Sequence, residues 1–143
     1  MRAPVRIVAA CTAVAVATTL LLGACGGGGS EPPLSAAGER GKEVAGSQGQ
    51  GCLGCHTTTG GRSTGPTWKD LAGSQVELST GRTVTADDAY LRRSILHARE
   101  QVVKGYPNIM PVYAGQLDER EVDDLIAYLQ DLSDQDGSSA SGS

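Results

Sequence analysis

The chain has 143 residues, which is enough for one domain of ordinary size, and its formal net charge is −4 at pH 7. It contains 20 glycines, one tryptophan, four tyrosines and no phenylalanine, so few large side chains are available to form a core. The negative charge argues against a nucleic-acid-binding protein, because a phosphate backbone attracts basic surfaces. This composition predicts a loop-rich fold whose interior is completed by something other than its own side chains.

The first 24 residues have the features of a secretory signal. Arg2 and Arg6 precede an apolar run from Ile7 to Leu22, which is short for a membrane-spanning helix. We therefore predict residues 1–24 to be a signal peptide that is removed. Both arginines leave with it, which changes the formal net charge from −4 to −6.

The segment ends in Leu22-Gly23-Ala24-Cys25, which resembles the lipobox of bacterial lipoproteins. The resemblance implies that Cys25 is lipidated and becomes the new N-terminus. The alternative is simple cleavage after Ala24, which would release a soluble protein and leave Cys25 as a stray thiol. Residues 25–38 are predicted to be the lipidated cysteine and a flexible linker, because they are rich in glycine and contain two adjacent prolines.

The folded domain is predicted to cover residues 39–133. A short helix is expected from about Ala36 to Ala45, although Gly38 and Gly41 interrupt it. The chain then becomes rich in glycine until residue 51.

Five consecutive residues, Cys52-Leu53-Gly54-Cys55-His56, form a C-x-x-C-H motif. This spacing is typical of haem attachment, in which two thiols add to the two vinyl groups of one haem and the histidine is the proximal iron ligand. A zinc site would need further ligands, and a thioredoxin-like redox pair would need a βαβ pattern that the sequence lacks. A disulfide between Cys52 and Cys55 would give His56 no role. We therefore predict one covalently attached haem c at Cys52 and Cys55, with His56 as an axial ligand.

After a loop over residues 57–64, Thr85 and Asp88 are expected to open a second helix, from Ala86 to about Arg99. Four of its apolar residues are expected to be buried, to different extents: Ala89, Leu91, Ile95 and Leu96.

The other axial ligand of an electron-carrying haem is methionine or histidine. Met110 is the only methionine once Met1 is removed, and it lies in a loop fixed by Pro107 and Pro111. Its alternative role is to fill a gap in the core. The rival ligand is His97, which we expect to be solvated near the end of the second helix. Met110 is therefore the predicted axial ligand.

The last predicted helix begins after Asp118, and Glu121 three residues later completes a capping box. Apolar residues then recur at helical spacing to form one stripe: Val122, Leu125, Ile126, Leu129 and Leu132. Residues 134–143 are rich in Ser, Gly and Asp and are predicted to be a disordered tail. These elements predict an all-α fold of three to four short helices around a prosthetic group.

The C-x-x-C-H motif, Gly65-Pro66, Met110-Pro111 and the terminal amphipathic helix make the chain similar to the class I, mono-haem cytochromes c. Over residues 65–132 the chain most resembles the cytochrome c domain of subunit II of caa3-type cytochrome c oxidases, here as a stand-alone lipoprotein. The resemblance implies the class I cytochrome c fold, wrapped around one covalently bound haem.

The resemblance also implies roles in the haem pocket. The carbonyl of Pro66 would accept a hydrogen bond from Nδ1–H of His56. Trp68 would donate its indole N–H to a haem propionate or pack on the haem edge, and Tyr106 and Tyr113 would form walls of the pocket. The chain departs from the family at Ala45, where an aromatic residue is usual.

We expect an electron carrier with no catalytic residue and no small-molecule substrate, at the outer face of the bacterial cytoplasmic membrane. The resemblance implies a haem-copper oxidase as acceptor and a quinol-oxidising complex as donor, with the protein acting as a free shuttle or a fixed subunit.

One alternative is a haem-based sensor or peroxidase-like enzyme with a displaceable Met110, and another is a surface lipoprotein with a disulfide. The charge distribution predicts a dipole that orients docking to a partner protein, and the alternative is that these charges lie on solvated helix faces. The acidic part is segment 118–143, and the basic residues are Arg82, Arg92, Arg93, Arg99 and Lys104.

Overall fold

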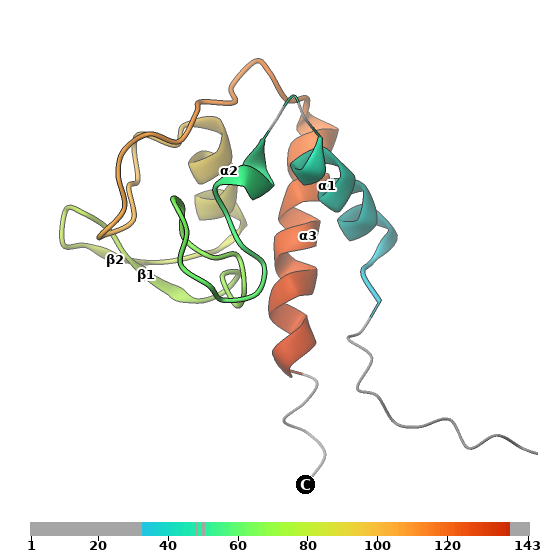
Figure 1. Cartoon of the computed structure of the whole chain (residues 1–143), viewed down its shortest axis with the longest axis horizontal. Coiled ribbons are helices and arrows are strands. Elements are labelled where there is room, and N and C mark those ends of the chain that lie inside the picture. The colour runs from blue at the N-terminus through green and yellow to red at the C-terminus, as the bar shows by residue number, and fades with distance from the viewer. Residues whose placement is uncertain (1–32, 48, 50, 138–143) are drawn as a thin grey trace, which may run out of the picture. The chain divides into compact units, whose positions relative to one another are not determined.

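The computed structural model describes residues 33–47, 49 and 51–137. The predicted signal peptide, Cys25 and most of the predicted linker lie outside these residues. The elements in chain order are α1 (Ala36–Gly46), the 3-10 helix η1 (Cys52–Gly54), β1 (Gln75–Glu77), β2 (Thr83–Thr85), α2 (Asp88–Leu96) and α3 (Glu119–Gly137). Both α1 and α2 pack against α3, and Figure 1 shows them on different sides of it. Within the described ranges, no helix is both long and apolar enough to cross a bilayer.

Helix α3 begins with the predicted capping box. The backbone N–H of Glu121 donates to the Asp118 carboxylate at 2.8 Å, and the Asp118 N–H donates to the Glu121 carboxylate at 2.9 Å. The predicted apolar stripe is buried throughout, and Tyr128 is buried beside it. The stripe therefore forms the centre of the core, as the 3.6-residue periodicity predicts.

The crossing of α1 and α3 depends on two glycines that the sequence suggested would only weaken α1. A Cβ atom added to Gly41 would lie 2.0 Å from the backbone oxygen of Asp124. One added to Gly38 would lie 1.9 Å from a carboxylate oxygen of Asp131. The absence of side chains at these two positions therefore lets the helix backbones approach closely. Ala45 is also buried in the core that includes Tyr128, so a small residue suits this contact.

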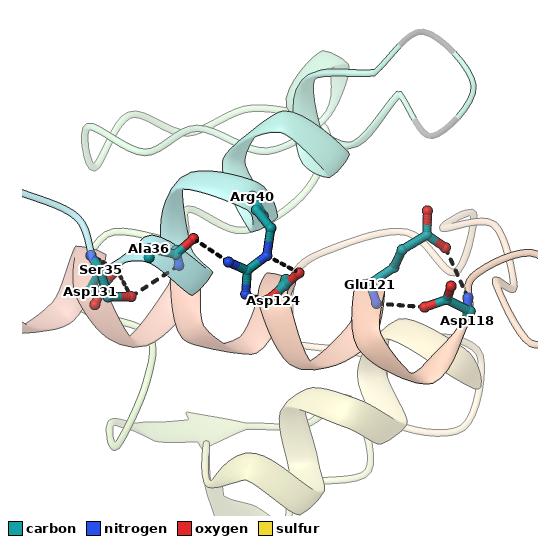
Figure 2. Close-up of polar contacts among 8 residues, drawn as sticks. Ser35, Ala36, Arg40, Asp118, Glu121, Asp124 and Asp131 are labelled. Atoms are coloured by element: carbon teal, nitrogen blue, oxygen red, sulfur yellow. Dashed lines mark hydrogen bonds and ion pairs between the residues drawn. The ribbon is translucent and has the colours of Figure 1, made fainter.

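Polar contacts fasten the same two helices (Figure 2). The Arg40 guanidinium binds the buried Asp124 carboxylate through two hydrogen bonds of 2.8 and 2.6 Å, and it also donates to the carbonyl of Ala36. The backbone N–H and hydroxyl of Ser35 both donate to the Asp131 carboxylate at 2.8 Å. The start of the described chain is thereby fixed against α3.

Helix α2 is shorter than predicted, and a different residue caps it. Asp87, rather than Thr85, accepts the backbone N–H of Tyr90 at 2.8 Å. The helix ends at Leu96 instead of continuing to Arg99. Leu91 is buried as expected, but Ala89 is exposed and Tyr90 is buried instead.

A two-stranded antiparallel sheet was not anticipated from the sequence. In it Val76 of β1 pairs with Val84 of β2, and Gly81 in the connecting turn has φ 81°, a conformation that glycine adopts without strain. An isolated bridge joins Leu78 to Val103, which ties the hairpin to the segment before Met110. The all-α class is confirmed, with this small sheet as an addition.

The C-terminal end of α3 corrects one predicted boundary. The helix continues to Gly137, four residues into the segment 134–143 that was predicted to be disordered. The Ser133 hydroxyl accepts the backbone N–H of Ala72 at 2.9 Å and donates to the carbonyl of Leu129. This contact with a loop stabilises the last part of the helix, which composition alone does not predict. Residues 138–143 lie outside the described part of the chain.

Candidate functional site

A cavity of about 380 Å³ lies between η1, α2, α3 and the loops around residues 64–68 and 101–113. This volume is within the range of small-molecule and cofactor sites. All the pocket and ligand residues predicted within the folded domain line it: Cys52, Cys55, His56, Pro66, Trp68, Tyr106, Met110 and Tyr113. The structure thus brings together residues that are up to 61 positions apart in the sequence.

The imidazole of His56 is buried and fixed in orientation. Its Nδ1 lies 2.7 Å from the carbonyl oxygen of Pro66, and because a carbonyl only accepts, Nδ1 carries the proton. The hydrogen bond expected from the resemblance is therefore present. In the neutral ring, Nε2 then has the available lone pair.

Burial also sets the charge of His56. The low-dielectric surroundings lower the pKa of His56 below its ordinary value, and the hydrogen bond to the Pro66 carbonyl opposes this shift only in part. The ring is therefore neutral at pH 7, which is the form that binds metal ions. No side chain separates it from Gly65, where an added Cβ would lie 2.6 Å from Cε1 of the ring.

Trp68 packs against both His56 and Tyr128. Its ring stacks on the imidazole with centroids 5.1 Å apart, and it meets Tyr128 edge to face at 6.1 Å. Trp68 is therefore part of a continuous aromatic contact from His56 to α3. This arrangement gives Trp68 a packing role, and its predicted bond to a propionate stays a prediction.

The two cysteines of the motif differ in their surroundings. The turn of η1 is closed by hydrogen bonds from the backbone N–H groups of Cys55 and His56 to the carbonyl of Cys52. No disulfide joins the cysteines; Cys55 is exposed and Cys52 is half-buried. Burial raises the pKa of the Cys52 thiol, and a hydrogen bond with Tyr113 partly offsets the rise.

The structure separates the two candidates for the second axial ligand. Met110 lines the cavity and packs against the core, whereas His97 is exposed at the end of α2 and is not among the lining residues. In the part of the chain described, no three His, Cys, Asp or Glu side chains gather as a metal-binding group. The cavity thus presents one imidazole and one thioether.

The cytochrome c family model matches residues 38–133. The chain belongs to the cytochrome c family. No curated protein sequence matches it at a significant level. Membership identifies the cofactor as covalently attached haem c and the general activity as electron transfer.

The residues of this cytochrome c fit that cofactor. The cavity has mostly apolar walls, a pair of cysteines at one side and a buried neutral imidazole. It therefore offers hydrocarbon contact for a macrocycle, two thiols for covalent attachment, and nitrogen and sulfur donors for iron.

Several residues around the haem cavity were not predicted from the sequence. Arg62 lies over the ring of Tyr106, with its guanidinium carbon 4.8 Å from the ring centroid, and donates to the carbonyl of Gly105 at 2.9 Å. This holds Tyr106 in place beside the Met110 loop. Tyr90 and Ser94 also line the cavity from successive turns of α2, and their four-residue spacing could have indicated a shared face.

The charges of the cytochrome are more closely paired than the sequence suggested. Arg92 of α2 binds Glu119 at 2.9 Å and also Asp123, which joins basic and acidic segments that were expected to form opposite ends of a dipole. Arg93 pairs with Glu100 at 3.3 Å, and Lys104 pairs with Glu77 at 2.6 Å. These contacts neutralise three of the five basic residues locally and weaken the case for a simple dipole.

Proposed function

We propose that this cytochrome c carries one haem and passes single electrons between respiratory complexes, while a lipid anchor holds it at the outer face of the bacterial cytoplasmic membrane. The observation that supports the proposal most strongly is that one cavity brings together Cys52, Cys55, His56 and Met110. This set contains two attachment thiols and two axial donors. In this role the protein is an electron carrier, and no catalytic side chain takes part.

Cys52 and Cys55 would hold haem c through two thioether bonds, and His56 Nε2 and the Met110 sulfur would bind its iron. When bound, haem c supplies a one-electron couple at its iron, and a methionine ligand raises the reduction potential. Pro66 fixes the imidazole plane through its hydrogen bond at 2.7 Å. Tyr106 and Tyr113 line the cavity and precede and follow Met110 in the sequence.

An optical spectrum of the protein produced with a cytochrome c maturation system tests this site. We expect a c-type spectrum, a weak long-wavelength sulfur-to-iron band in the ferric state, and no response to carbon monoxide. Met110→Ala should abolish the weak band and allow carbon monoxide to bind. His97→Ala is the matched control, because His97 is exposed and outside the cavity. Carbon monoxide binding to the wild-type protein would instead favour a sensor or a peroxidase-like enzyme.

The membrane anchor rests on the sequence Leu22-Gly23-Ala24-Cys25. Cys25→Ala should move the protein from the membrane fraction to the soluble exported fraction, whereas Ser30→Ala should leave it in the membrane fraction. Release of the wild-type protein without detergent would contradict lipidation.

The acceptor we propose is a haem-copper oxidase, and the donor is a quinol-oxidising complex. The support is the similarity of residues 65–132 to the cytochrome c domain of caa3-type oxidase subunit II. Copurification in mild detergent tests the partners: a constant ratio to an oxidase indicates a fixed subunit, and a free pool that reduces an oxidase indicates a shuttle. Failure to reduce any haem-copper oxidase would reject this acceptor.

A further inference from the structure

The exposed side chain of Arg62 connects two loops that both contribute residues to the haem cavity. Its Nη2 donates to the carbonyl of Gly105 at 2.9 Å, and its guanidinium carbon lies 4.8 Å from the centroid of the Tyr106 ring. Gly105 is 43 residues further along the chain. Arg62 itself does not line the cavity, so any effect that it has there is exerted through the residues it contacts.

Arg62 extends from the loop that supports His56. It follows His56 by six residues, and the carbonyl of Pro66 in the same loop accepts the hydrogen bond from the imidazole. The hydroxyl of Thr57 donates to the carbonyl of Gly61, the residue directly before Arg62, at 2.6 Å. The base of the Arg62 side chain is therefore fixed close to the haem-attachment motif.

The other loop carries the second axial donor. In residues 105–112, which we call the Met110 loop, Tyr106 and Met110 are half-buried and the other six residues are exposed. Just before the loop, the N–H of Lys104 donates to the carbonyl of Glu77 at 2.9 Å, and their side chains form an ion pair at 2.6 Å. A segment with a fixed end and an exposed interior opens at low cost in free energy. Contacts that restrain this loop therefore affect how often Met110 leaves the cavity.

Arg62 contacts the Met110 loop at the point where it leaves this fixed end. Gly105 has φ 82°, a conformation that favours glycine, so the chain turns at this residue. The guanidinium is hydrogen-bonded to the turn and lies over the ring of the next residue, which restrains both. A planar guanidinium donates within its plane while its face covers an aromatic ring, and the ammonium of lysine lacks this geometry.

We propose that Arg62 is a positioning residue that holds the Met110 loop closed and thereby keeps small external ligands from replacing the Met110 sulfur. The inference rests on the proposed axial role of Met110. Because Arg62 is anchored beside His56, its contacts fix the loops of the two axial donors to each other. The ligands excluded in this way are small neutral donors such as imidazole.

The binding of imidazole to the ferric holoprotein tests this role. The apparent affinity of such a ligand is proportional to the fraction of protein whose loop is open. Arg62→Gln removes one hydrogen bond and one exposed cation–π contact, so the apparent affinity should rise roughly three- to tenfold. Amide hydrogen exchange of residues 105–112, measured by mass spectrometry on the same holoprotein, should accelerate by a similar factor.

Two further variants separate the contacts of Arg62 from its charge. Arg62→Lys keeps the charge without the planar group, so its imidazole affinity should be closer to that of Arg62→Gln than to the wild type. Arg82→Gln is the matched control, because Arg82 is also exposed and does not line the cavity. It should leave both the imidazole affinity and the exchange of residues 105–112 unchanged.

Three results would overturn the proposal. They are an unchanged imidazole affinity in Arg62→Gln, an equal rise in Arg82→Gln, and wild-type affinity in Arg62→Lys, which would make charge alone sufficient. Failure of the proposed function is distinguishable, because the wild-type ferric spectrum would then lack the sulfur-to-iron band before any variant is made. Hydrogen exchange of the Met110 loop would still report whether Arg62 restrains it.

Discussion

The ring of His56 is held between a hydrogen bond from Nδ1 to the Pro66 carbonyl at 2.7 Å and the bare backbone of Gly65. Two adjacent residues thus determine which ring nitrogen carries the proton and how much space the imidazole has. The neutral, oriented ring is the property on which the proposed axial role of His56 depends.

Gly65→Ala should displace this ring. The added Cβ would lie 2.6 Å from Cε1 of His56, and backbone on one side and Trp68 on the other limit its movement. We expect lower haem incorporation, a shifted reduction potential and a loss of stability of about 1–3 kcal/mol from overpacking. Optical spectra and thermal unfolding measure these effects.

Gly61→Ala is the control for this variant. A Cβ at Gly61 would meet no atom within 4 Å, so its spectrum and potential should match the wild type. If Gly65→Ala and Gly61→Ala have the same spectrum and the same potential, the backbone of Gly65 does not restrict the position of His56.

Gly41→Ala should separate α1 from α3. Its Cβ would lie 2.0 Å from the backbone oxygen of Asp124, and neither helix backbone can move without disturbing the core. We expect destabilisation of about 3 kcal/mol, at the upper end of typical overpacking costs. Chemical denaturation measures the free energy of unfolding, and Gly46→Ala, which meets no atom within 4 Å, should have little effect. A neutral Gly41→Ala would contradict the close crossing.

The Arg40–Asp124 pair should make stability depend on pH. The Arg40 hydrogen bond lowers the pKa of Asp124 below its ordinary value despite the opposing effect of desolvation. The carboxylate therefore contributes stability that is fully present above the ordinary Asp pKa and is lost as pH falls through the lowered one. Asp124→Asn should reduce the free energy of unfolding near neutral pH and flatten its decline in acid.

Acid titration followed by circular dichroism compares these proteins. Glu100→Gln is the control, because Glu100 and Arg93 are both exposed and 3.3 Å apart, and exposed pairs contribute little. If Asp124→Asn and the wild type have identical acid profiles, the pair does not couple the two helices.

The capping box of α3 gives a local prediction. Asp118→Ala removes the acceptor of the Glu121 N–H and should cost about 1 kcal/mol. Asp118→Asn, which retains an oxygen acceptor, should recover most of the loss. Thermal unfolding of the two variants measures the difference, and equal melting temperatures would contradict a capping role.

Features encoded in short, local patterns could be predicted from the sequence. The C-x-x-C-H spacing, the isolated Met110 and the Asp118–Glu121 box each depend on residues whose chemistry is visible without a fold. The burial of the α3 stripe follows from its periodicity. The first two of these patterns supply Cys52, Cys55, His56 and Met110 of the candidate site.

Features that depend on distant partners could not be predicted. Strands β1 and β2 have three residues each, too few to show alternation. Thr85 and Asp87 are both suitable N-cap residues by type, so the sequence alone does not show which of them caps α2. The glycine at position 41 looks like a helix interruption until Asp124, 83 residues later, is placed against it. Tyr90 and Ser94 likewise become part of the cavity lining only once α2 packs against α3.

The pairing of α1 with α3 has a consequence for how the protein is assembled. Arg40 and Asp124 are 84 residues apart, so the two helices meet only after almost the whole chain is available, and closing so long a loop is slow. Leu125 and Leu129 of α3 form part of the cavity wall. During synthesis, the cysteines at positions 52 and 55 are therefore made while that wall is still missing. Both thiols are therefore most open before α3 is in place, and docking of that last helix completes the wall of the cavity beside them.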